Sequence, residues 1–112
     1  MRRGEVWWAS LPIPAGSAPG MRRPVVVVQA NPFNESRINT VVVAAVTSNL
    51  ALASAPGNVR VSKSDAGLPQ PSVVNVSQLL TIDRSLLTER IKLLPPPAVQ
   101  SINEGLRLVL AL

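Results

Sequence analysis

The chain has 112 residues and a mass of 11.9 kDa, with 46% hydrophobic and 15% charged side chains. These values predict one globular domain over residues 1–112 and exclude a disordered chain. Cys, His and Tyr are all absent, which excludes disulfides, thiolate or imidazole metal sites, cysteine nucleophiles and the Ser-His-Asp triad. Any catalysis must therefore use Arg, Lys, Asp, Glu, Ser or Thr.

The charge balance is strongly basic. Eleven Lys and Arg residues, nine of them Arg, stand against six Asp and Glu, for a net charge of +5 and a pI near 11.5. The planar guanidinium group matches the oxygens of a phosphate. The balance slightly favours a nucleic acid as partner over charge that serves only solubility.

The N-terminus and the apolar runs predict a cytoplasmic protein with no membrane partner. Arg2 and Arg3 are followed at once by Gly4 and Glu5, so no apolar signal-peptide core follows them. The longest apolar runs, such as residues 41–46, fall far short of the roughly 18 residues that a membrane helix needs.

The first two thirds of the chain predict short strands. An aromatic-rich segment at residues 5–11 ends at Pro12, and β-branched runs follow after Pro24 and at residue 40. The further predicted strands are residues 25–29, 40–46, 58–61 and 72–76. Residues 12–23 form a Pro- and Gly-rich loop that is either a binding loop or a plain surface connection.

The end of the chain predicts a helix. Three prolines at residues 95–97 break the chain, and Pro97 or Ala98 can begin a helix that runs to Leu112. Its apolar stripe repeats every three or four residues, at Val99, Ile102, Leu106 and Val109. Leu108 and Leu112 widen this apolar face beyond what one small sheet covers, so we expect the helix to pack on its own sheet and to join a dimer contact.

Several short strands, one terminal helix and no βαβ alternation predict a mostly β protein. We expect a small antiparallel sheet that closes toward a barrel, with a C-terminal α-helix.

One cluster of polar residues lies at the predicted strand ends and in the adjoining loops. It comprises Gly16, Ser17, Arg22, Arg23, Pro24, Thr47, Ser48, Asn49 and Gln78. Such a set can bind a phosphate and stabilise charge, and it offers no metal ligands. Taken singly, each position is explained more simply as a solvated turn, a cap or a partner for the backbone.

Seven segments spread over nearly the whole chain form an ordered set of motifs: Arg3–Trp7, Gly16-Ser17, Arg23–Val28, Thr47–Asn49, Gln78–Asp83, Leu87–Ile91 and Glu104–Leu112. In these motifs and their order, the sequence resembles the MazF/PemK family of toxin endoribonucleases.

The resemblance implies an SH3-like barrel that dimerises through its sheet and C-terminal helix and cleaves single-stranded RNA without metal or cofactor. Arg23 and Thr47 are then the catalytic pair, Ser17 and Gln78 line the RNA site, and Asn49 is a third candidate for RNA binding. It also implies a cognate antitoxin whose flexible acidic tail occupies the RNA groove.

The implied chemistry explains the missing histidine. The RNA 2′-OH attacks the adjacent phosphorus and leaves a 2′,3′-cyclic phosphate and a 5′-OH, so the enzyme mainly positions groups and stabilises charge. Arg23 supplies a cationic fork and Thr47 a neutral hydroxyl donor. A guanidinium keeps its proton in water at any working pH, so it is a poor general base.

Two departures from the family pattern bear on specificity more than on activity. Ala18 and Pro19 follow Gly16-Ser17 where the family usually has Glu, which removes the obvious carboxylate base. Leu80 replaces a usual Arg. A Trp could stack on an RNA base, but Trp7 and Trp8 lie in an early strand, where Trp is more often part of the core.

Two rival functions remain open from the sequence. A CcdB-type toxin shares the fold and poisons gyrase without cleaving anything, but such proteins usually rely on an aromatic residue near the C-terminus, and this chain ends Leu110-Ala111-Leu112. The second rival is an inactive barrel kept as an interaction module.

Overall fold

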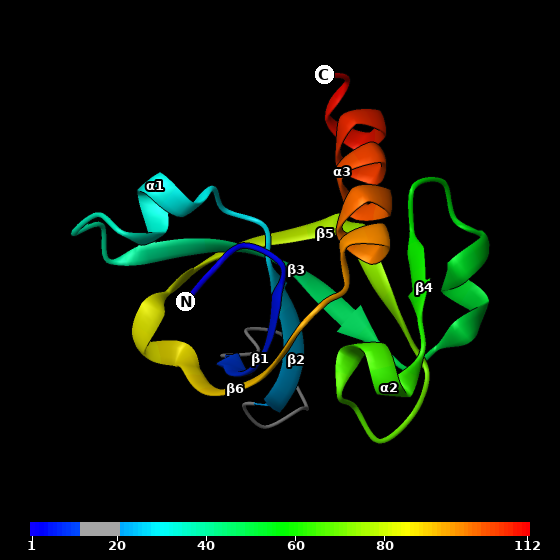
Figure 1. Ribbon diagram of the computed structural model, residues 1–112, viewed down its shortest axis with the longest axis horizontal. Coiled ribbons are helices and arrows are strands. Elements are labelled where there is room, and N and C mark those ends of the chain that lie inside the picture. The colour runs from blue at the N-terminus through cyan, green and yellow to red at the C-terminus, as the bar shows by residue number, and fades with distance from the viewer. Residues whose placement is uncertain (12–20) are drawn as a thin grey trace.

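A computed structural model gives the fold and describes residues 1–11 and 21–112. Six strands and a long C-terminal helix dominate it (Figure 1). The strands are β1 (Glu5–Leu11), β2 (Met21–Val27), β3 (Thr40–Thr47), β4 (Val59–Val61), β5 (Ser72–Asp83) and β6 (Leu87–Leu93). The helices are α1 (Asn31–Asn34), α2 (Lys63–Ala66) and α3 (Pro96–Leu110), with 3₁₀ turns η1 (Leu50–Ser54) and η2 (Arg84–Leu86).

All six strands pair antiparallel in one curled sheet, in the order β4-β5-β3-β2-β1-β6. The β-branched run of β2 lies near the middle of this sheet, where both of its faces are covered: Val25, Val26 and Val27 are all buried. Continuous β-branched runs are typical of strands buried on both faces. The predicted fold class, a mostly β antiparallel sheet with a C-terminal helix, is confirmed.

Each face of the sheet has its own apolar core because side chains alternate along a strand. On one face, Val6 and Val26 pack with Ile102 and Leu106 of α3. On the other face, Val25 and Val27 pack in a second cluster with Ala9, Leu11, Val41, Val43 and Ile82. The sheet therefore separates two apolar cores. We call the edge of the sheet at the ends of β2 and β3, where Arg23 and Thr47 lie, the rim.

Helix α2 connects β4 and β6, the two edge strands of the curled sheet. It follows β4 directly, and its Ser62 side chain caps it by accepting a hydrogen bond from the Asp65 amide (3.1 Å). The ammonium group of Lys92 in β6 donates to the Ser64 carbonyl (2.6 Å). Gly67 ends α2 at φ 69° with its Cα against Ile91 of β6. The short helix α2 thus links the two edge strands, which the backbone pairing of the sheet does not join.

Four elements differ from the prediction. β5 runs on to Asp83, and β6 is an additional strand, because their polar and charged side chains hide the alternation that marks a half-buried strand. β2 begins before Pro24, which is tolerated since the paired part of β2 and β3 starts only at Val25. No helix is predicted from the sequence at residues 31–34, which form α1, with proline in the first turn, where a backbone amide has no helical partner.

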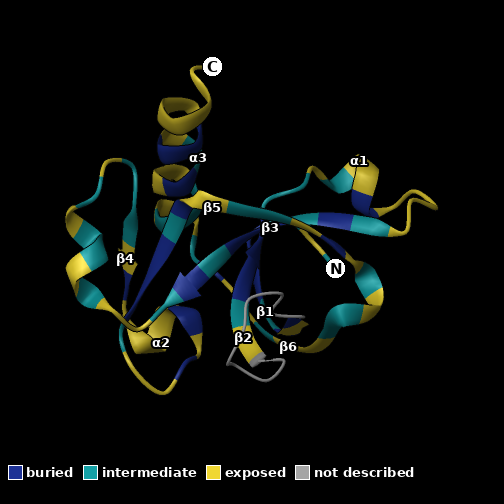
Figure 2. Ribbon diagram, turned by 180° about the vertical axis from the view of Figure 1, so that it is seen from behind, coloured by how far each residue is buried: buried dark blue, intermediate teal, exposed yellow. Residues whose placement is uncertain are grey.

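Helix α3 packs on the sheet with its first half and extends beyond it with its second (Figures 1 and 2). Ile102 and Leu106 of the predicted stripe are buried and Val99 packs against them, but Val109 is 42% exposed. Several other apolar side chains of this helix end are exposed: Leu108, Leu110 and Leu112. Among the described residues, no helix is long and apolar enough to cross a membrane.

Candidate active site

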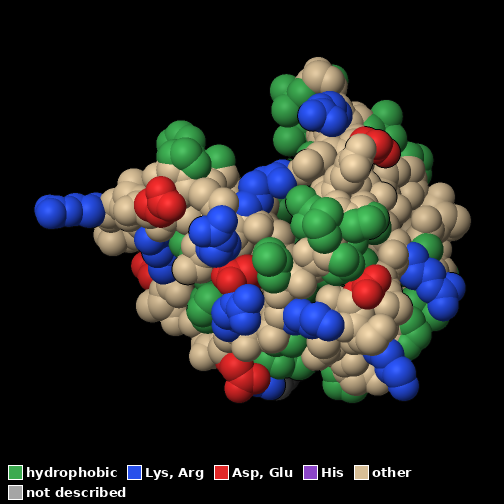
Figure 3. Space-filling model, viewed as in Figure 1, with side chains coloured by type: hydrophobic (Ala, Val, Ile, Leu, Met, Phe, Trp, Pro, Cys, Tyr) green, Lys and Arg blue, Asp and Glu red, His purple; other side chains and the backbone are tan. Residues whose placement is uncertain are grey.

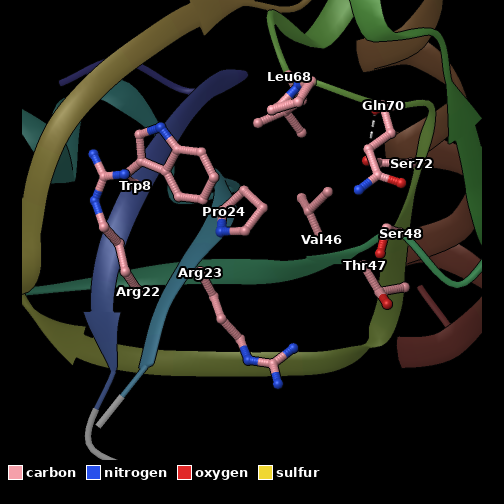
Figure 4. A pocket seen from close by; sticks show the side chains of 11 residues that line it. Trp8, Arg22, Arg23, Pro24, Val46, Thr47, Ser48, Leu68, Gln70 and Ser72 are labelled. Atoms are coloured by element: carbon pink, nitrogen blue, oxygen red, sulfur yellow. Dashed lines mark hydrogen bonds between the residues drawn. The ribbon is translucent and has the colours of Figure 1, made fainter.

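Arg23 and Thr47 lie at neighbouring ends of β2 and β3. In the β2–β3 ladder Val25 faces Ala45, and extending this antiparallel register by two residues places Arg23 opposite Thr47. Residues opposite each other on adjacent strands point to the same face of the sheet. The two side chains predicted as the catalytic pair therefore lie on neighbouring strand ends and line the same cavities, one of which is seen in Figure 4.

Two cavities meet at this pair. The first, which we call the Trp8 cavity, has a volume of about 230 Å³ and is lined by Trp8, Arg22, Arg23, Pro24, Val46, Thr47, Ser48, Leu68, Pro69, Gln70 and Ser72. The second, the Gln78 cavity, has a volume of about 530 Å³ and is lined by Leu11, Arg23, Ala45, Val46, Thr47, Leu52, Gln78, Leu80, Thr81 and Ile82. Of the residues that the structure describes, Arg23, Val46 and Thr47 line both cavities, so a group held between Arg23 and Thr47 has a cavity on either side.

Among the described residues, the charged side chains that line the two cavities are both positive. Arg22 and Arg23 are the charged residues among the described residues that line the two cavities, which include no Asp or Glu. A guanidinium beside a hydroxyl on an open rim suits a phosphate group. Nowhere in residues 1–11 and 21–112 do three His, Cys, Asp or Glu side chains gather as they would around a metal ion.

Thr47 is held in place by the turn that follows it. Its hydroxyl accepts a hydrogen bond from the backbone amide of Asn49 (3.1 Å), and a hydroxyl that accepts one bond still has its own proton to donate. The side chain of Asn49 caps η1 by accepting from the Ala51 amide (3.2 Å). Asn49 is not among the described lining residues of either cavity, and the role seen here is structural.

Gln78 reaches the site through a bulge in β5. Neighbouring residues Ala44 and Ala45 of β3 pair with Leu79 and Asn75, so residues 76–78 are extra on the β5 side. Bulges of this kind re-aim side chains next to functional sites. Here the bulge brings Gln78 to the wall of a cavity that Arg23 and Thr47 also line, although Gln78 lies across β3 from Arg23.

Two asparagines satisfy the backbone of this bulge. Asn58 accepts from the Val76 amide (3.0 Å) and donates to the Leu52 carbonyl (2.9 Å), which ties β5 to η1. Asn75 accepts from both the amide (3.3 Å) and the hydroxyl (2.8 Å) of Ser77. Sequence reasoning did not identify Asn58, because its partners lie six and eighteen residues away.

Of the remaining positions singled out in the sequence, the structure describes Leu80 but not Ser17 or Ala18. Leu80, which stands where the family usually has Arg, lines the Gln78 cavity as an apolar wall. The loop at residues 68–72 also lines the Trp8 cavity and was missed; its only sequence signal is a pair of prolines, Pro69 and Pro71, before a strand.

A sequence comparison decides the family. Residues 2–110 match the sequence model of the family described as "PemK-like, MazF-like toxin of type II toxin-antitoxin system". The chain belongs to this toxin family. The resemblance seen in the motifs is thereby confirmed, and the CcdB-type alternative receives no support.

This toxin has named relatives of nearly equal length. It is 46% identical over 110 residues to the Mycobacterium tuberculosis protein named "Endoribonuclease MazF6", covering 98% of this chain and 96% of that one. It is 34% identical over 112 residues to "Endoribonuclease EndoA" of Bacillus subtilis, covering 100% and 96%.

Solved structures share the fold of this toxin. The Mycobacterium tuberculosis toxin MazF-mt6 superposes with a TM-score of 0.79 at 23% identity, covering 96% of this chain and 97% of that one. The MazE-MazF crystal structure from Deinococcus radiodurans (Form-II) superposes with a TM-score of 0.80 at 22% identity, covering 100% and 96%.

Proposed function

We propose that this toxin is an endoribonuclease that cuts single-stranded RNA with Arg23 and Thr47 at the scissile phosphate. The observation that carries the proposal is the register of β2 and β3, which sets a guanidinium opposite a hydroxyl at an open rim with a cavity on each side. The names of the relatives support the reaction class.

The proposed reaction uses the RNA's own 2′-OH as nucleophile. The 2′ oxygen attacks the adjacent phosphorus in line, the bond from phosphorus to the 5′ oxygen breaks, and the products end in a 2′,3′-cyclic phosphate and a 5′-OH. The guanidinium of Arg23 stabilises charge that grows on the phosphoryl oxygens, and the Thr47 hydroxyl donates to the same group. Since no carboxylate is among the described lining residues and the chain has no imidazole, we assign proton transfer to water.

Further RNA contacts are proposed for Gln78, Ser17 and Asn49. Gln78 is supported by its place in the wall of the larger cavity, where its amide can donate and accept hydrogen bonds. Ser17 stays a prediction from the Gly-Ser motif. Asn49 stays a prediction as well, with its backbone amide bound to Thr47 as its link to the catalytic pair.

The proposed partners are an antitoxin and a second copy of this toxin. A flexible acidic antitoxin tail would find only positive charge among the described residues of the rim, and a similar structure is titled "Endoribonuclease in complex with its cognate antitoxin from Mycobacterial species". The dimer would form through the sheet and α3, whose outer end leaves Leu108, Leu110 and Leu112 exposed. Figure 3 shows apolar side chains near the end of α3 and on the arm that carries α1.

Alanine substitution at the two catalytic positions tests the function. Arg23→Ala and Thr47→Ala are expected to lose cleavage of a mixed-sequence RNA by at least about 100-fold, because each removes a charge or donor at the reacting phosphate. Arg60→Ala, which removes an exposed cation from β4, is the charge-matched control and is expected to cleave normally. Circular dichroism and sedimentation check that fold and assembly are unchanged.

The substrate provides a second test. A single 2′-deoxy residue on the 5′ side of the mapped cut should block cleavage there and leave binding intact. Full cleavage by both Arg23→Ala and Thr47→Ala, or cleavage at the deoxy residue, would refute this mechanism.

A further inference from the structure

The Trp8 cavity has one apolar side and one polar side. The apolar side consists of Trp8, Pro24, Val46 and Leu68. Across from the rings of Trp8 and Pro24, Figure 4 shows the amide of Gln70 and the hydroxyls of Ser48 and Thr47. With about 230 Å³, the cavity is smaller than the roughly 300–1,000 Å³ of sites for drug-sized ligands, so it takes one small group.

A flat group with an apolar face and hydrogen-bonding edges fits such a space. We propose that the Trp8 cavity binds one nucleobase of the RNA, that of a nucleotide directly next to the scissile phosphate, with Trp8 as its stacking wall and Gln70 reading its edge. This inference rests on the proposed function and specifies how that function selects its sequence.

Trp8 is held in place by Arg22, which lines the same cavity. The guanidinium of Arg22 lies 4.4 Å from the centre of the Trp8 ring, and its Nη2 atom is 3.6 Å from Oε2 of Glu89. Glu89 is the partner of Trp8 across the β1–β6 ladder. The Arg22 and Glu89 side chains are 54% and 62% exposed, so their ion pair contributes little to stability. The ion pair with Glu89 instead holds the guanidinium of Arg22 over the ring of Trp8.

The position of the catalytic pair sets which base enters. Arg23 and Thr47 line both cavities, so a phosphate bound between them has the Trp8 cavity on one side and the Gln78 cavity on the other. The nucleosides on either side of that phosphate point away from each other along the strand. One of the two flanking bases therefore enters the Trp8 cavity, and the other lies toward Gln78.

The polar wall gives the cavity its power to select. The Gln70 amide carries both donor and acceptor atoms, and Ser48 adds a hydroxyl. Gln70 lies in the loop before β5, whose conformation is held by a hydrogen bond from the Ser72 hydroxyl to the Gln70 carbonyl (3.2 Å). Stacking on Trp8 accepts any base, whereas hydrogen bonds to an edge distinguish one base from another.

The test couples a protein change to a substrate change. A short RNA with the mapped cut site is prepared with an abasic residue on the 5′ or the 3′ side of the cut, and cleavage by wild type and by Trp8→Leu is measured on each. Loss of a stacked base costs roughly 5- to 150-fold. We expect that loss for wild type at one of the two positions, the same loss for Trp8→Leu on normal RNA, and no further loss when both changes are combined.

Two further variants keep the test decisive. Trp8→Phe retains an aromatic wall and is expected to recover most of the activity, and Gln70→Ala is expected to broaden base preference at the coupled position in a randomised RNA. Arg60→Ala serves as the control with normal rates and preference. If Trp8→Leu does not fold, Gln70→Ala alone decides, because an unchanged preference at both flanking positions overturns the proposal.

Other outcomes separate this inference from the proposed function. If Arg23→Ala abolishes cleavage while the losses from Trp8→Leu and both abasic residues multiply independently, the base pocket is wrong and the nuclease stands. If wild type cuts no RNA, both the proposed nuclease function and the base pocket are wrong.

A binding experiment separates RNA from an antitoxin as the occupant of the cavity. In a Trp7→Phe background Trp8 is the one tryptophan, and its fluorescence should be quenched by a non-cleavable 2′-deoxy analogue of the RNA. Quenching by an acidic peptide but not by this analogue would assign the cavity to an antitoxin and overturn the proposal.

Discussion

Gly105 of α3 lies directly against the backbone of Gly57, in the turn that leads to β4. A Cβ atom at position 105 would overlap the Gly57 carbonyl oxygen and lie 3.0 Å from its carbonyl carbon. Gly57 itself has a φ of 80°, a conformation that side chains other than glycine's rarely adopt. Two glycines that are 48 positions apart thus bring α3 close enough to the sheet to bury Ile102 and Leu106.

This contact predicts that Gly105→Ala destabilises the protein. The new methyl group forces α3 away from Gly57, and overpacking of this kind costs typically about 1–3 kcal/mol, more than the gain in helix propensity. Urea unfolding followed by circular dichroism measures the change. Ser101→Ala, on an exposed position of the same helix, should stay within about 0.5 kcal/mol of wild type. Equal stability of both variants would contradict the close packing.

Asn58 is predicted to be a positioning residue for Gln78. Asn58→Ala leaves the Val76 amide without its partner at the bulge, which costs about 1–3 kcal/mol of stability. Asn58→Asp keeps an oxygen that can accept from Val76 and should recover part of the loss. The decisive measurement is RNA binding: Asn58→Ala should weaken it to about the level of Gln78→Ala, and the two changes together should weaken it little more. Additive losses would show that Asn58 acts only on stability.

Glu5 should make the protein sensitive to acid. Burial by itself would raise the pKa of Glu5, but hydrogen bonds from the Arg90 side chain (2.5 Å), the Arg2 amide (2.7 Å) and the Trp7 indole (3.1 Å) outweigh it and lower the pKa below its ordinary value of 4.5. A lowered pKa in the folded state means that the carboxylate stabilises the protein above about pH 4.5 and that this contribution is lost as the pH falls further.

The matching variant is Glu5→Gln. At pH 7 it should lose about 1–2 kcal/mol, since Arg90 is half exposed and water replaces part of the interaction. Between pH 5 and about pH 3 its free energy of unfolding should fall less steeply than that of wild type. Glu35→Gln, on an exposed carboxylate, should keep the wild-type slope. Parallel pH curves for Glu5→Gln and wild type would rule out this role for Glu5.

Cleavage should not require a metal ion. The proposed chemistry uses a guanidinium and a hydroxyl, so removal of divalent ions with EDTA should leave the rate within about twofold of that measured with Mg²⁺. The comparison is made on a short unstructured RNA, because Mg²⁺ also folds longer RNAs. Loss of cleavage in EDTA, restored by adding a divalent ion, would show that the mechanism is wrong.

Local patterns in the sequence were sufficient for the central strands and for the placement of Arg23 and Thr47, the proposed catalytic pair, at neighbouring strand ends. The Val-rich runs of β2 and β3 predicted buried strands because β-branched side chains favour a pleated, covered backbone. Arg23 and Thr47 were singled out at the ends of two such runs, and strands that are neighbours in sequence often pair. The first half of α3 followed from its apolar spacing, Val99 to Leu106, which is also a local property.

Tertiary structure alone decided the features that join distant parts of the chain. The bulge that carries Gln78 depends on Asn58, α3 depends on the meeting of Gly105 with Gly57, and the Trp8 cavity requires a loop from residues 68–72 to lie over β1 and β2. β6 pairs with β1 across 78 to 88 positions although its own sequence is mostly polar. Periodicity and propensity describe one segment at a time, whereas these contacts arise from the packing of segments whose partners no local pattern specifies.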